Sequence, residues 1–144
     1  PLRLEEDRVS LVKGIKDNLI DVIVSDHIPE DEESKRLPFA QAATGAIGIE
    51  TLLPLALEMY HNESLPLNKI IETLTINPAK ILQINKGTLK KGSDGDISIL
   101  DLDAPWAVKA EKLKSKSKNT AIEGRKLQGK VLMTFLNGEL VFNQ

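Results

Sequence analysis

The sequence predicts an α/β fold built in two parts, residues 1–84 and residues 85–144. In the first part apolar residues recur at helical spacing, and one short β-branched run, residues 20–24, suits a strand covered on both faces of a parallel sheet. After Gly87 the apolar period changes to two, which predicts strands separated by turns. We therefore expect a helix-rich region with one buried strand, followed by part of a small β domain.

Helices are expected throughout the first part. Apolar residues spaced three and four apart mark several helical spans, the first of them with one buried stripe. The expected spans are residues 4–17, 49–60, 67–75 and a short helix that ends at Leu82. Pro54 should lie in an early turn or at a kink, while Asn77 and Pro78 should supply the N-cap and first turn of the short helix. Residues 29–36 are acidic and then basic without an apolar period, so an exposed loop is expected there.

The second part should contain a β hairpin. Residues 97–99 and 131–136 have the pattern of strands between turns, and Asn137-Gly138 is a strong signal for a two-residue turn of the primed kind. The Lys-rich residues 109–118 are expected to form a solvated connection, with a specific anion site as the less favoured alternative.

Composition excludes several classes of protein. With 41% hydrophobic and 28% charged residues, the 144-residue chain has the balance of a globular protein, and its net charge of −2 gives no broad attraction for nucleic acid or anionic lipid. No apolar run approaches the roughly 20 residues that span a bilayer, so a cytoplasmic location is expected. Without cysteine, a metal would need His, Asp or Glu ligands. Because a helical pattern follows Pro1 directly, we expect the chain to continue upstream in a longer protein.

Asp26 is the strongest candidate for chemistry. It stands at the carboxyl end of the predicted buried strand, where barrel enzymes place metal ligands and proton carriers, although a carboxylate that caps the next turn is an equal alternative. For His27 a loop position with hydrogen bonds to the backbone is favoured over a ligand or a substrate contact, and His61 is expected at the surface. One Asp and one His cannot complete a zinc site, which needs about four ligands, or three and a water.

Several short motifs follow one another along the chain. They are Pro1-Leu2-Arg3, Asp21 to Pro29 with Ser25-Asp26-His27, Gly48-Ile49-Glu50-Thr51, Asn77-Pro78-Ala79-Lys80, Lys86-Gly87-Thr88-Leu89 with Gly92, Asp94 and Asp96, and Gly129-Lys130-Val131. Over essentially the whole chain this order resembles class I dihydroorotases. The resemblance implies that residues 1–84 are the last strand and outer helices of an amidohydrolase (β/α)8 TIM-type barrel, and that residues 85–144 are the C-terminal part of its small β domain. A complete barrel takes about 250 residues, so this chain would supply only part of one.

The resemblance also implies a function. Class I dihydroorotases interconvert carbamoyl-aspartate and dihydroorotate in pyrimidine biosynthesis and depend on zinc. The Asp of their Asp-His-x-Pro segment is a metal ligand and the proton carrier, which assigns both roles to Asp26. The glycine turn that contacts substrate through its backbone corresponds to Thr44 and Gly45. The other ligands of one or two zinc ions would precede Pro1, so the isolated chain is expected to be inactive.

Two residues depart from the family pattern. Glu30 stands at a substrate-binding position where His is usual, and its charge should disfavour a carboxylate-bearing substrate by on the order of 1 kcal/mol or more. Thr44 stands where Phe is commoner. Glu30 keeps one alternative open, a non-catalytic dihydroorotase-like structural partner of aspartate carbamoyltransferase. A second alternative, an enzyme of the hydantoinase or allantoinase type, belongs to the same superfamily but fits Gly48-Ile49-Glu50-Thr51 and Lys35-Arg36-Leu37-Pro38-Phe39 less well.

The expected partners follow from these interpretations. An enzyme of this kind binds a small-molecule substrate, and we expect neither nucleic acid nor a membrane as a partner. A homodimer and a complex with aspartate carbamoyltransferase are the two protein assemblies that stay open.

Overall fold

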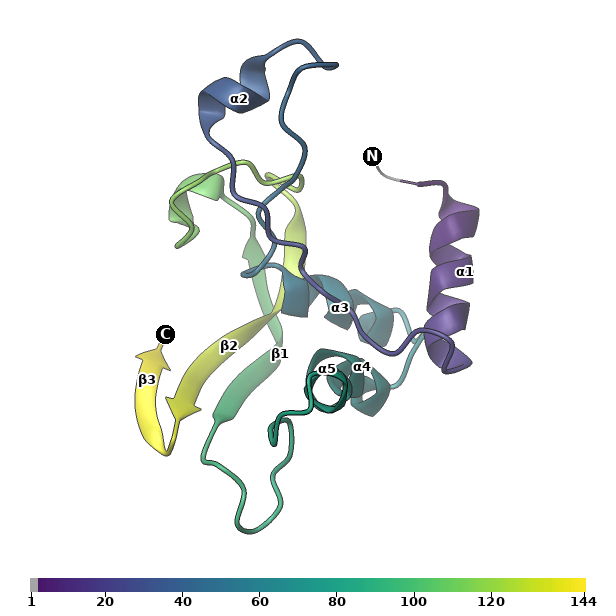
Figure 1. Ribbon diagram of the computed structural model, residues 1–144, viewed down its shortest axis with the longest axis vertical. Helices are drawn as coiled ribbons and strands as arrows, with labels where there is room; N and C mark the ends of the chain where they lie inside the picture. Colours follow the sequence, from purple (N-terminus) through teal and green to yellow (C-terminus); the bar gives the residue numbers. More distant parts are fainter. Residues whose placement is uncertain (1–2) are drawn as a thin grey trace. The chain divides into compact units, whose positions relative to one another are not determined.

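The computed structural model describes residues 3–144, so Pro1 and Leu2 of the Pro-Leu-Arg motif lie outside the described residues. Helices dominate the first half of the chain and strands the second (Figure 1). The elements are α1 (Glu5–Lys16), α2 (Glu32–Arg36), α3 (Leu52–His61), α4 (Leu67–Leu74), α5 (Ile76–Ile81), β1 (Ile97–Ala107), the 3-10 helix η1 (Ala110–Lys112), β2 (Lys126–Leu136) and β3 (Glu139–Asn143). None of the helices within residues 3–144 is long and apolar enough to cross a bilayer.

The chain forms two compact units, each assembled from separate stretches of sequence. Unit 1 contains the chain up to Ile23 together with Ala56–Asp101 and Val131–Gln144. Unit 2 contains Val24–Leu55 and Leu102–Lys130. Both units draw on residues from either side of residue 85, and the assignment of residues 1–84 and 85–144 to separate domains stays a prediction.

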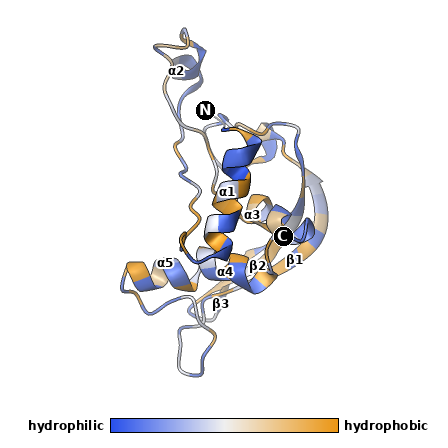
Figure 2. Ribbon diagram, turned by 90° about the vertical axis from the view of Figure 1, so that its right-hand side faces the viewer, coloured by the Kyte–Doolittle hydropathy of each residue, from blue (hydrophilic) through white to orange (hydrophobic). Residues whose placement is uncertain are grey.

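The core of unit 1 joins α1 to α3 and α4. Its buried residues are Ile15, Ala56, Leu65 and Ile70, against which Val12, Ile20, Ile23, Met59 and Leu74 pack. The predicted buried stripe of α1 is correct only for the carboxyl-terminal half of the helix, because that half alone reaches the cluster. Val9 and Leu11 are 53% and 55% exposed. Figure 2 shows hydrophilic and hydrophobic residues mixed along α1.

Residues 20–24 are extended but do not form the predicted strand. A strand needs a neighbour with which to exchange ladder hydrogen bonds. Here the Ile23 N–H donates to the Thr73 carbonyl at 3.2 Å, and the Asp21 carbonyl accepts from Asn77 Nδ2 at 2.9 Å, so the bonds run to α4 and α5. Asn77 therefore lies inside α5 and anchors the extended segment, which corrects its predicted role as the N-cap of that helix.

Helix α2 replaces the loop expected at residues 29–36. Asp31 is its N-cap, with a carboxylate oxygen that accepts from the Ser34 N–H at 2.7 Å. Glu32 and Glu33 occupy its first turn and Lys35 and Arg36 its last, the charge order that the helix dipole favours. The acidic and then basic pattern thus indicated a short helix.

The later helices are close to their predicted spans. Helix α3 begins at Leu52 instead of residue 49, with Pro54 in its first turn as expected. Helix α4 ends one residue before the predicted end of its span.

The strands form one sheet in the order β1-β2-β3. Strands β2 and β3 pair antiparallel, with Leu136 opposite Glu139 across a two-residue turn. Asn137 and Gly138 both have positive φ, 51° and 83°, so the predicted hairpin and its primed turn are confirmed.

Two contacts hold the turn against the residues that precede β1. The Gly138 N–H donates to the Gly95 carbonyl at 2.9 Å, and the Asn137 N–H donates to Asp96 Oδ1 at 2.8 Å. Asp96 Oδ2 also accepts from Lys86 Nζ at 2.5 Å. Lys86 and Asp96, which belong to the motif that begins at Lys86, therefore meet at the hairpin turn.

The ion pair between Lys86 and Asp96 predicts a pH-dependent contribution to stability. The Asn137 backbone N–H and the Lys86 ammonium lower the pKa of the Asp96 carboxyl. Such a group stabilises the folded state above its unfolded pKa, about 3.9, and this contribution is lost as the pH falls through its folded pKa. We expect Asp96→Asn to lower the free energy of unfolding at pH 7, and the difference from wild type to shrink below about pH 3.

Urea unfolding at the two pH values measures the effect. Asp94→Asn is the matched control, because Asp94 pairs with Lys86 at 2.6 Å but does not bond Asn137, and its effect at pH 7 should be smaller. A difference between Asp96→Asn and wild type that is equal at both pH values would contradict the prediction.

Candidate functional site

Two segments of unit 2 lie side by side and contain all four residues expected at the site. Residues 25–30 and residues 44–48, here called the loop pair, are joined by a parallel bridge between His27 and Ala46. The Ile28 N–H donates to the Ala46 carbonyl at 2.9 Å. The structure thus brings Asp26 and Glu30 of one segment together with the Thr44-Gly45 turn of the other.

The two backbones approach so closely that only glycine fits at two positions. A Cβ added to Gly45 would lie 2.6 Å from Cβ of Ile28, and Gly45 has φ of 109°. A Cβ added to Gly48 would lie 2.7 Å from the Ser25 carbonyl oxygen. Real Cβ atoms do not approach other heavy atoms this closely, so the loop pair depends on these two glycines.

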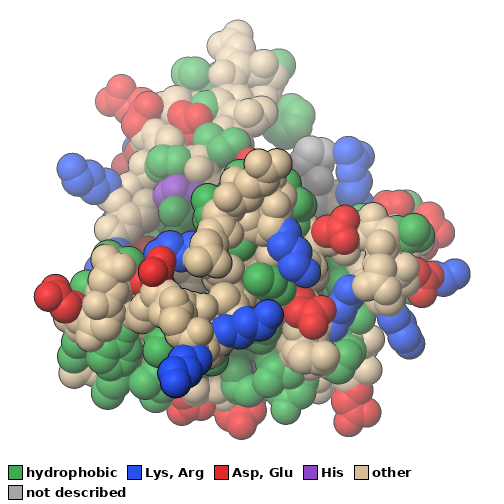
Figure 3. Space-filling view, turned by 60° about the horizontal axis from the view of Figure 1, so that its bottom comes forward, with side chains coloured by type: hydrophobic (Ala, Val, Ile, Leu, Met, Phe, Trp, Pro, Cys, Tyr) green, Lys and Arg blue, Asp and Glu red, His purple; other side chains and the backbone are tan. Residues whose placement is uncertain are grey.

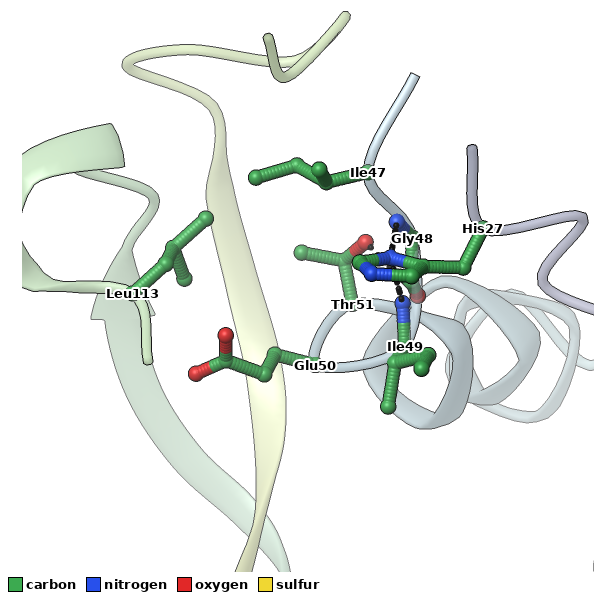
Figure 4. A pocket seen from close by; sticks show the side chains of 7 residues that line it. All are labelled: His27, Ile47, Gly48, Ile49, Glu50, Thr51 and Leu113. Carbon is green, nitrogen blue, oxygen red and sulfur yellow. Dashed lines mark hydrogen bonds between the residues drawn. The ribbon is translucent and has the colours of Figure 1, made fainter. Parts of the chain in front are cut away.

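His27 bonds to the backbone of the neighbouring segment. Its Nδ1 accepts from the Gly48 N–H at 3.0 Å and from the Ile49 N–H at 3.4 Å (Figure 4). An Nδ1 that accepts hydrogen bonds leaves the proton of the neutral ring on Nε2. The interpretation favoured from the sequence, a loop histidine bonded to backbone, is confirmed.

Beside His27 is a small hollow that also contains Glu50. Its lining is His27, Ile47, Gly48, Ile49, Glu50, Thr51 and Leu113 (Figure 4). The Glu50 carboxylate accepts from the backbone N–H groups of Lys114 and Ser115 at 2.9 and 3.1 Å. The Glu50 side chain therefore occupies two of the backbone N–H donors of the Lys-rich segment, residues 109–118.

The Lys-rich residues 109–118 are more ordered than a solvated connection. They include η1, and Leu113 is buried in the core of unit 2 with Ile47, Val108 and Leu127. The Lys118 ammonium donates to the carbonyls of Leu113 and Ser115, each at 2.8 Å. All five lysines of this segment are exposed, as expected.

Asp26 lies at a sharp change of backbone direction. Its φ is 43°, in the left-handed region that Asp tolerates better than most residues, and it is exposed. Gly48 lies against both neighbours, since a Cβ there would lie 2.7 Å from the Ser25 carbonyl oxygen and His27 Nδ1 accepts the Gly48 N–H. The unusual backbone conformation of Asp26 is therefore maintained from both sides.

The described residues do not make a metal centre by themselves. Within residues 3–144 no group of three or more His, Asp and Glu side chains is arranged to hold a metal ion. Asp26 offers a single carboxylate, which suits one oxygen ligand of a zinc ion but not a complete site. Its role as a metal ligand and catalytic residue stays a prediction.

Glu30 and the Thr44-Gly45 turn are also fixed by contacts within unit 2. The Glu30 N–H donates to Asn119 Oδ1 at 3.3 Å, and the Ser34 hydroxyl lies 3.5 Å from Glu30 Oε2. Lys35 Nζ donates to the carbonyls of Ala43 and Gly45, at 2.7 and 2.9 Å, so it joins the two residues on either side of the exposed Thr44.

No sequence pattern assigned a role at the site to Lys35 or Asn119. Lys35 falls in the charged stretch that was expected to be an exposed loop, where a lysine is unremarkable. Asn119 follows a run of lysines and serines, and 91 residues separate it from its partner Ile28. No local pattern indicates a contact over that separation, so only an alignment or a structure could have found it.

Comparisons with known proteins agree with this architecture. The family that matches the sequence is described as the amidohydrolase family, and the match covers residues 2–141. Dihydroorotases from Ehrlichia chaffeensis and Aquifex aeolicus are 46% and 44% identical to this chain over 142 residues, or 99% of it. The chain spans only 32% and 33% of their lengths, about a third of each.

Solved structures show the same fold. An L-hydantoinase (dihydropyrimidinase) from Arthrobacter aurescens matches with a TM-score of 0.91 and 34% identity, covering 99% of this chain and 33% of that one. A dihydropyrimidinase from Brevibacillus agri NCHU1002 matches with a TM-score of 0.93 and 24% identity, covering 99% of this chain and 32% of that one. These matches confirm the predicted fold class, a part of an amidohydrolase barrel.

Gly45→Ala and Gly124→Ala form a matched pair that tests the close approach within the loop pair. Both glycines have positive φ, but a Cβ on Gly124 would meet nothing within 4 Å, whereas one on Gly45 would collide with Ile28. Left-handed backbone alone costs alanine about 1–2 kcal/mol, and overpacking typically adds about 1–3 kcal/mol. Gly45→Ala should therefore destabilise the protein by about 1–3 kcal/mol more than Gly124→Ala in urea unfolding. Equal losses for the two variants would show that the segments can separate at little cost.

Proposed function

The chain belongs to the amidohydrolase family, and from that premise we propose that it is the carboxy-terminal portion of a zinc-dependent cyclic amide hydrolase of the dihydroorotase type. The proposed reaction is the reversible hydrolysis of dihydroorotate to carbamoyl-aspartate, in pyrimidine biosynthesis and in the cytoplasm. The observation that carries the proposal is the loop pair, which brings Asp26 beside a glycine turn of the kind that contacts substrate. Similarity to dihydroorotases over 99% of the chain supports the same assignment.

Asp26 is proposed to move the proton in this reaction. Hydrolysis forms a bond between a water oxygen and the ring amide carbon and breaks the bond from that carbon to the ring nitrogen. A zinc centre, completed by ligands from outside this chain, would supply a water that ionises near neutral pH. The Asp26 carboxylate would take the proton from the attacking water and deliver it to the leaving nitrogen.

The Thr44-Gly45 turn is proposed to bind substrate through its N–H groups. The Gly45 carbonyl oxygen accepts from Lys35 Nζ at 2.9 Å and from Asn119 Nδ2 at 3.4 Å, so both of its lone pairs are engaged. The amide donors of the turn remain the suitable partners for a carboxylate or carbonyl oxygen of the substrate.

A second candidate function rests on Glu30. Its negative charge lies four residues after Asp26, in the segment that is proposed to face a doubly carboxylated product. A non-catalytic dihydroorotase-like protein, acting as a structural partner of aspartate carbamoyltransferase, would tolerate that charge. The residues upstream of Pro1 distinguish the candidates, because a catalytic parent must contain the remaining zinc ligands there.

A hydantoinase type of enzyme is less well supported. The L-hydantoinase that shares this fold is 34% identical, against 46% for the dihydroorotase from Ehrlichia chaffeensis. Homodimer formation and a complex with aspartate carbamoyltransferase remain proposals for the parent protein.

The isolated 144-residue chain is expected to show no turnover of dihydroorotate. The described residues provide one candidate ligand, and a catalytic zinc ion needs three protein ligands and an open position. The measurement is the rate of carbamoyl-aspartate formation by purified chain of verified mass, in buffer with added zinc. Measurable turnover would contradict the expectation that the remaining ligands of the catalytic zinc ion lie outside this chain.

In the full-length parent we expect Asp26→Asn to abolish hydrolysis while the fold stays intact. Asparagine keeps the shape of the side chain but cannot carry the proton, and general acid–base transfer alone is worth about 10² to 10⁴ in rate. The loss of a metal ligand should add to this effect, so kcat should fall by more than about a hundredfold. Steady-state rates and bound zinc are measured for both proteins.

The alternative role of Asp26 makes a different prediction. A carboxylate that only capped the turn would be replaced by Asn with little change, because the two residues cap almost equally well. Activity within about tenfold of wild type, with unchanged zinc content, would support that role.

A further inference from the structure

We infer that Asn119 is a positioning residue that holds the loop pair in its working geometry. The inference rests on the proposed function, because it gives the loop pair its chemical role. Asn119 lies outside the segments that contain Asp26 and Gly45, and its side chain is half-buried. We assign it no contact with the reacting atoms.

The side chain of Asn119 bonds to both segments of the loop pair. Its Nδ2 donates to the Ile28 carbonyl at 3.1 Å and to the Gly45 carbonyl at 3.4 Å. Its Oδ1 accepts from the Glu30 N–H at 3.3 Å, and its backbone carbonyl accepts from the Ile47 N–H at 3.2 Å. One residue therefore links the stretch that follows Asp26 to the glycine turn.

Asn119 can act in this way because its own segment is anchored. Leu113 is buried in the core of unit 2, and the Glu50 carboxylate holds the backbone of Lys114 and Ser115. Lys118 ties the end of the segment to the carbonyls of Leu113 and Ser115. The amide is thus presented from a fixed support, a condition for positioning a neighbouring loop.

The contacts require an amide side chain. Two carbonyl oxygens need donors and one N–H needs an acceptor, and among side chains of this length only Asn offers both. Aspartate would keep the acceptor for Glu30, lose both donors, and place a negative charge beside the carbonyl oxygens of Ile28 and Gly45. Lys35 also bonds Gly45, but the two hydrogen bonds from its ammonium go to Ala43 and Gly45, both in the stretch around the turn.

The test uses three variants of the full-length protein. Asn119→Ala removes all three side-chain bonds, and Asn119→Asp keeps only the one from Glu30. Lys116→Ala is the matched control, since Lys116 is an exposed residue of the same segment. Circular dichroism and urea unfolding establish that each variant is folded before the other measurements.

Amide hydrogen exchange measures positioning without depending on activity. In Asn119→Ala the Glu30 amide should exchange about tenfold faster than in Lys116→Ala, because it has lost its acceptor. In Asn119→Asp the same amide should keep most of its protection, while the Gly45 turn loosens. Exchange at Glu30 that is unchanged in Asn119→Ala would overturn the inference.

Kinetics with dihydroorotate measure the consequence for the proposed reaction. Misplacement of the loop pair should lower kcat/KM by about a hundredfold in Asn119→Ala, with kcat and KM both altered. Asn119→Asp should not restore activity, because it lacks the two donors. A merely structural role would lower the amount of active enzyme and leave KM at the wild-type value.

The outcomes separate this inference from the proposed function. If the wild-type parent, with zinc bound, does not turn over dihydroorotate, the proposed function is wrong and hydrogen exchange alone decides the role of Asn119. If wild type is active and a folded Asn119→Ala variant has wild-type kcat and KM, Asn119 is not a positioning residue. If Asn119→Ala does not fold, a wild-type KM in Asn119→Asp would likewise show that Asn119 is not a positioning residue.

Discussion

The close approach of two backbones in unit 2 is the constraint on which the rest of the candidate site depends. Gly45 and Gly48 allow residues 44–48 to lie against residues 25–28 at distances that any Cβ would prevent. The bridge at His27 and Ala46 then becomes available, and the His27 ring reaches the Gly48 N–H. Asp26 is held between these contacts in a backbone conformation that it would rarely adopt alone.

Residues within the loop pair and residues distant in sequence contribute to this arrangement in different ways. Glycines set how near the segments come, hydrogen bonds from Asn119 link the two segments, and Lys35 bonds the glycine turn alone. Glu50 extends the same network to the Lys-rich segment. Every contact named for the site falls within unit 2, whose own buried cluster contains Ile47 and Leu113 beside the loop pair. The sequence positions involved range over most of the chain, but their contacts form one connected set.

Local sequence patterns predicted the parts of the fold that local physics determines. The Asn137-Gly138 turn and helix α4 were found because backbone preference and apolar period point to the same answer. Residues 20–24 have the composition of a buried strand, but a strand is defined by its neighbours, and here the hydrogen bonds run to helices. Helix α2 was missed because five residues without an apolar face give no periodic signal, and only its charge order and the Asp31 cap indicate a helix.

The candidate site could be predicted only in part for the same reason. The resemblance of short motifs pointed to Asp26 and the Thr44-Gly45 turn, and the structure places them in adjoining segments. Nothing in the composition of the Lys-rich stretch indicated that it supports them, because the link runs through one amide side chain and backbone atoms. A hydrogen bond to a backbone carbonyl does not depend on which residue supplies that carbonyl, so the sequence of the bonded segment does not reveal it.

Many large apolar side chains remain exposed on the described residues, among them Phe39, which is 98% exposed. Figure 3 shows such side chains in several groups between charged ones on one face. A surface of this kind is common where a polypeptide normally has further protein against it. The proposal that this chain is part of a longer enzyme accounts for that surface, since the relatives are about three times as long.

The bond between Glu50 and the Lys-rich segment has a consequence for sequence drift. The carboxylate binds the backbone N–H groups of residues 114 and 115, which every amino acid except proline provides. The side chains at positions 114 and 115 can therefore be replaced by any other except proline without loss of the contact. Glu50 has no such freedom, because its carboxylate is the acceptor that both amides share. Part of what holds this Lys-rich segment in place is thus an acidic residue more than sixty positions away.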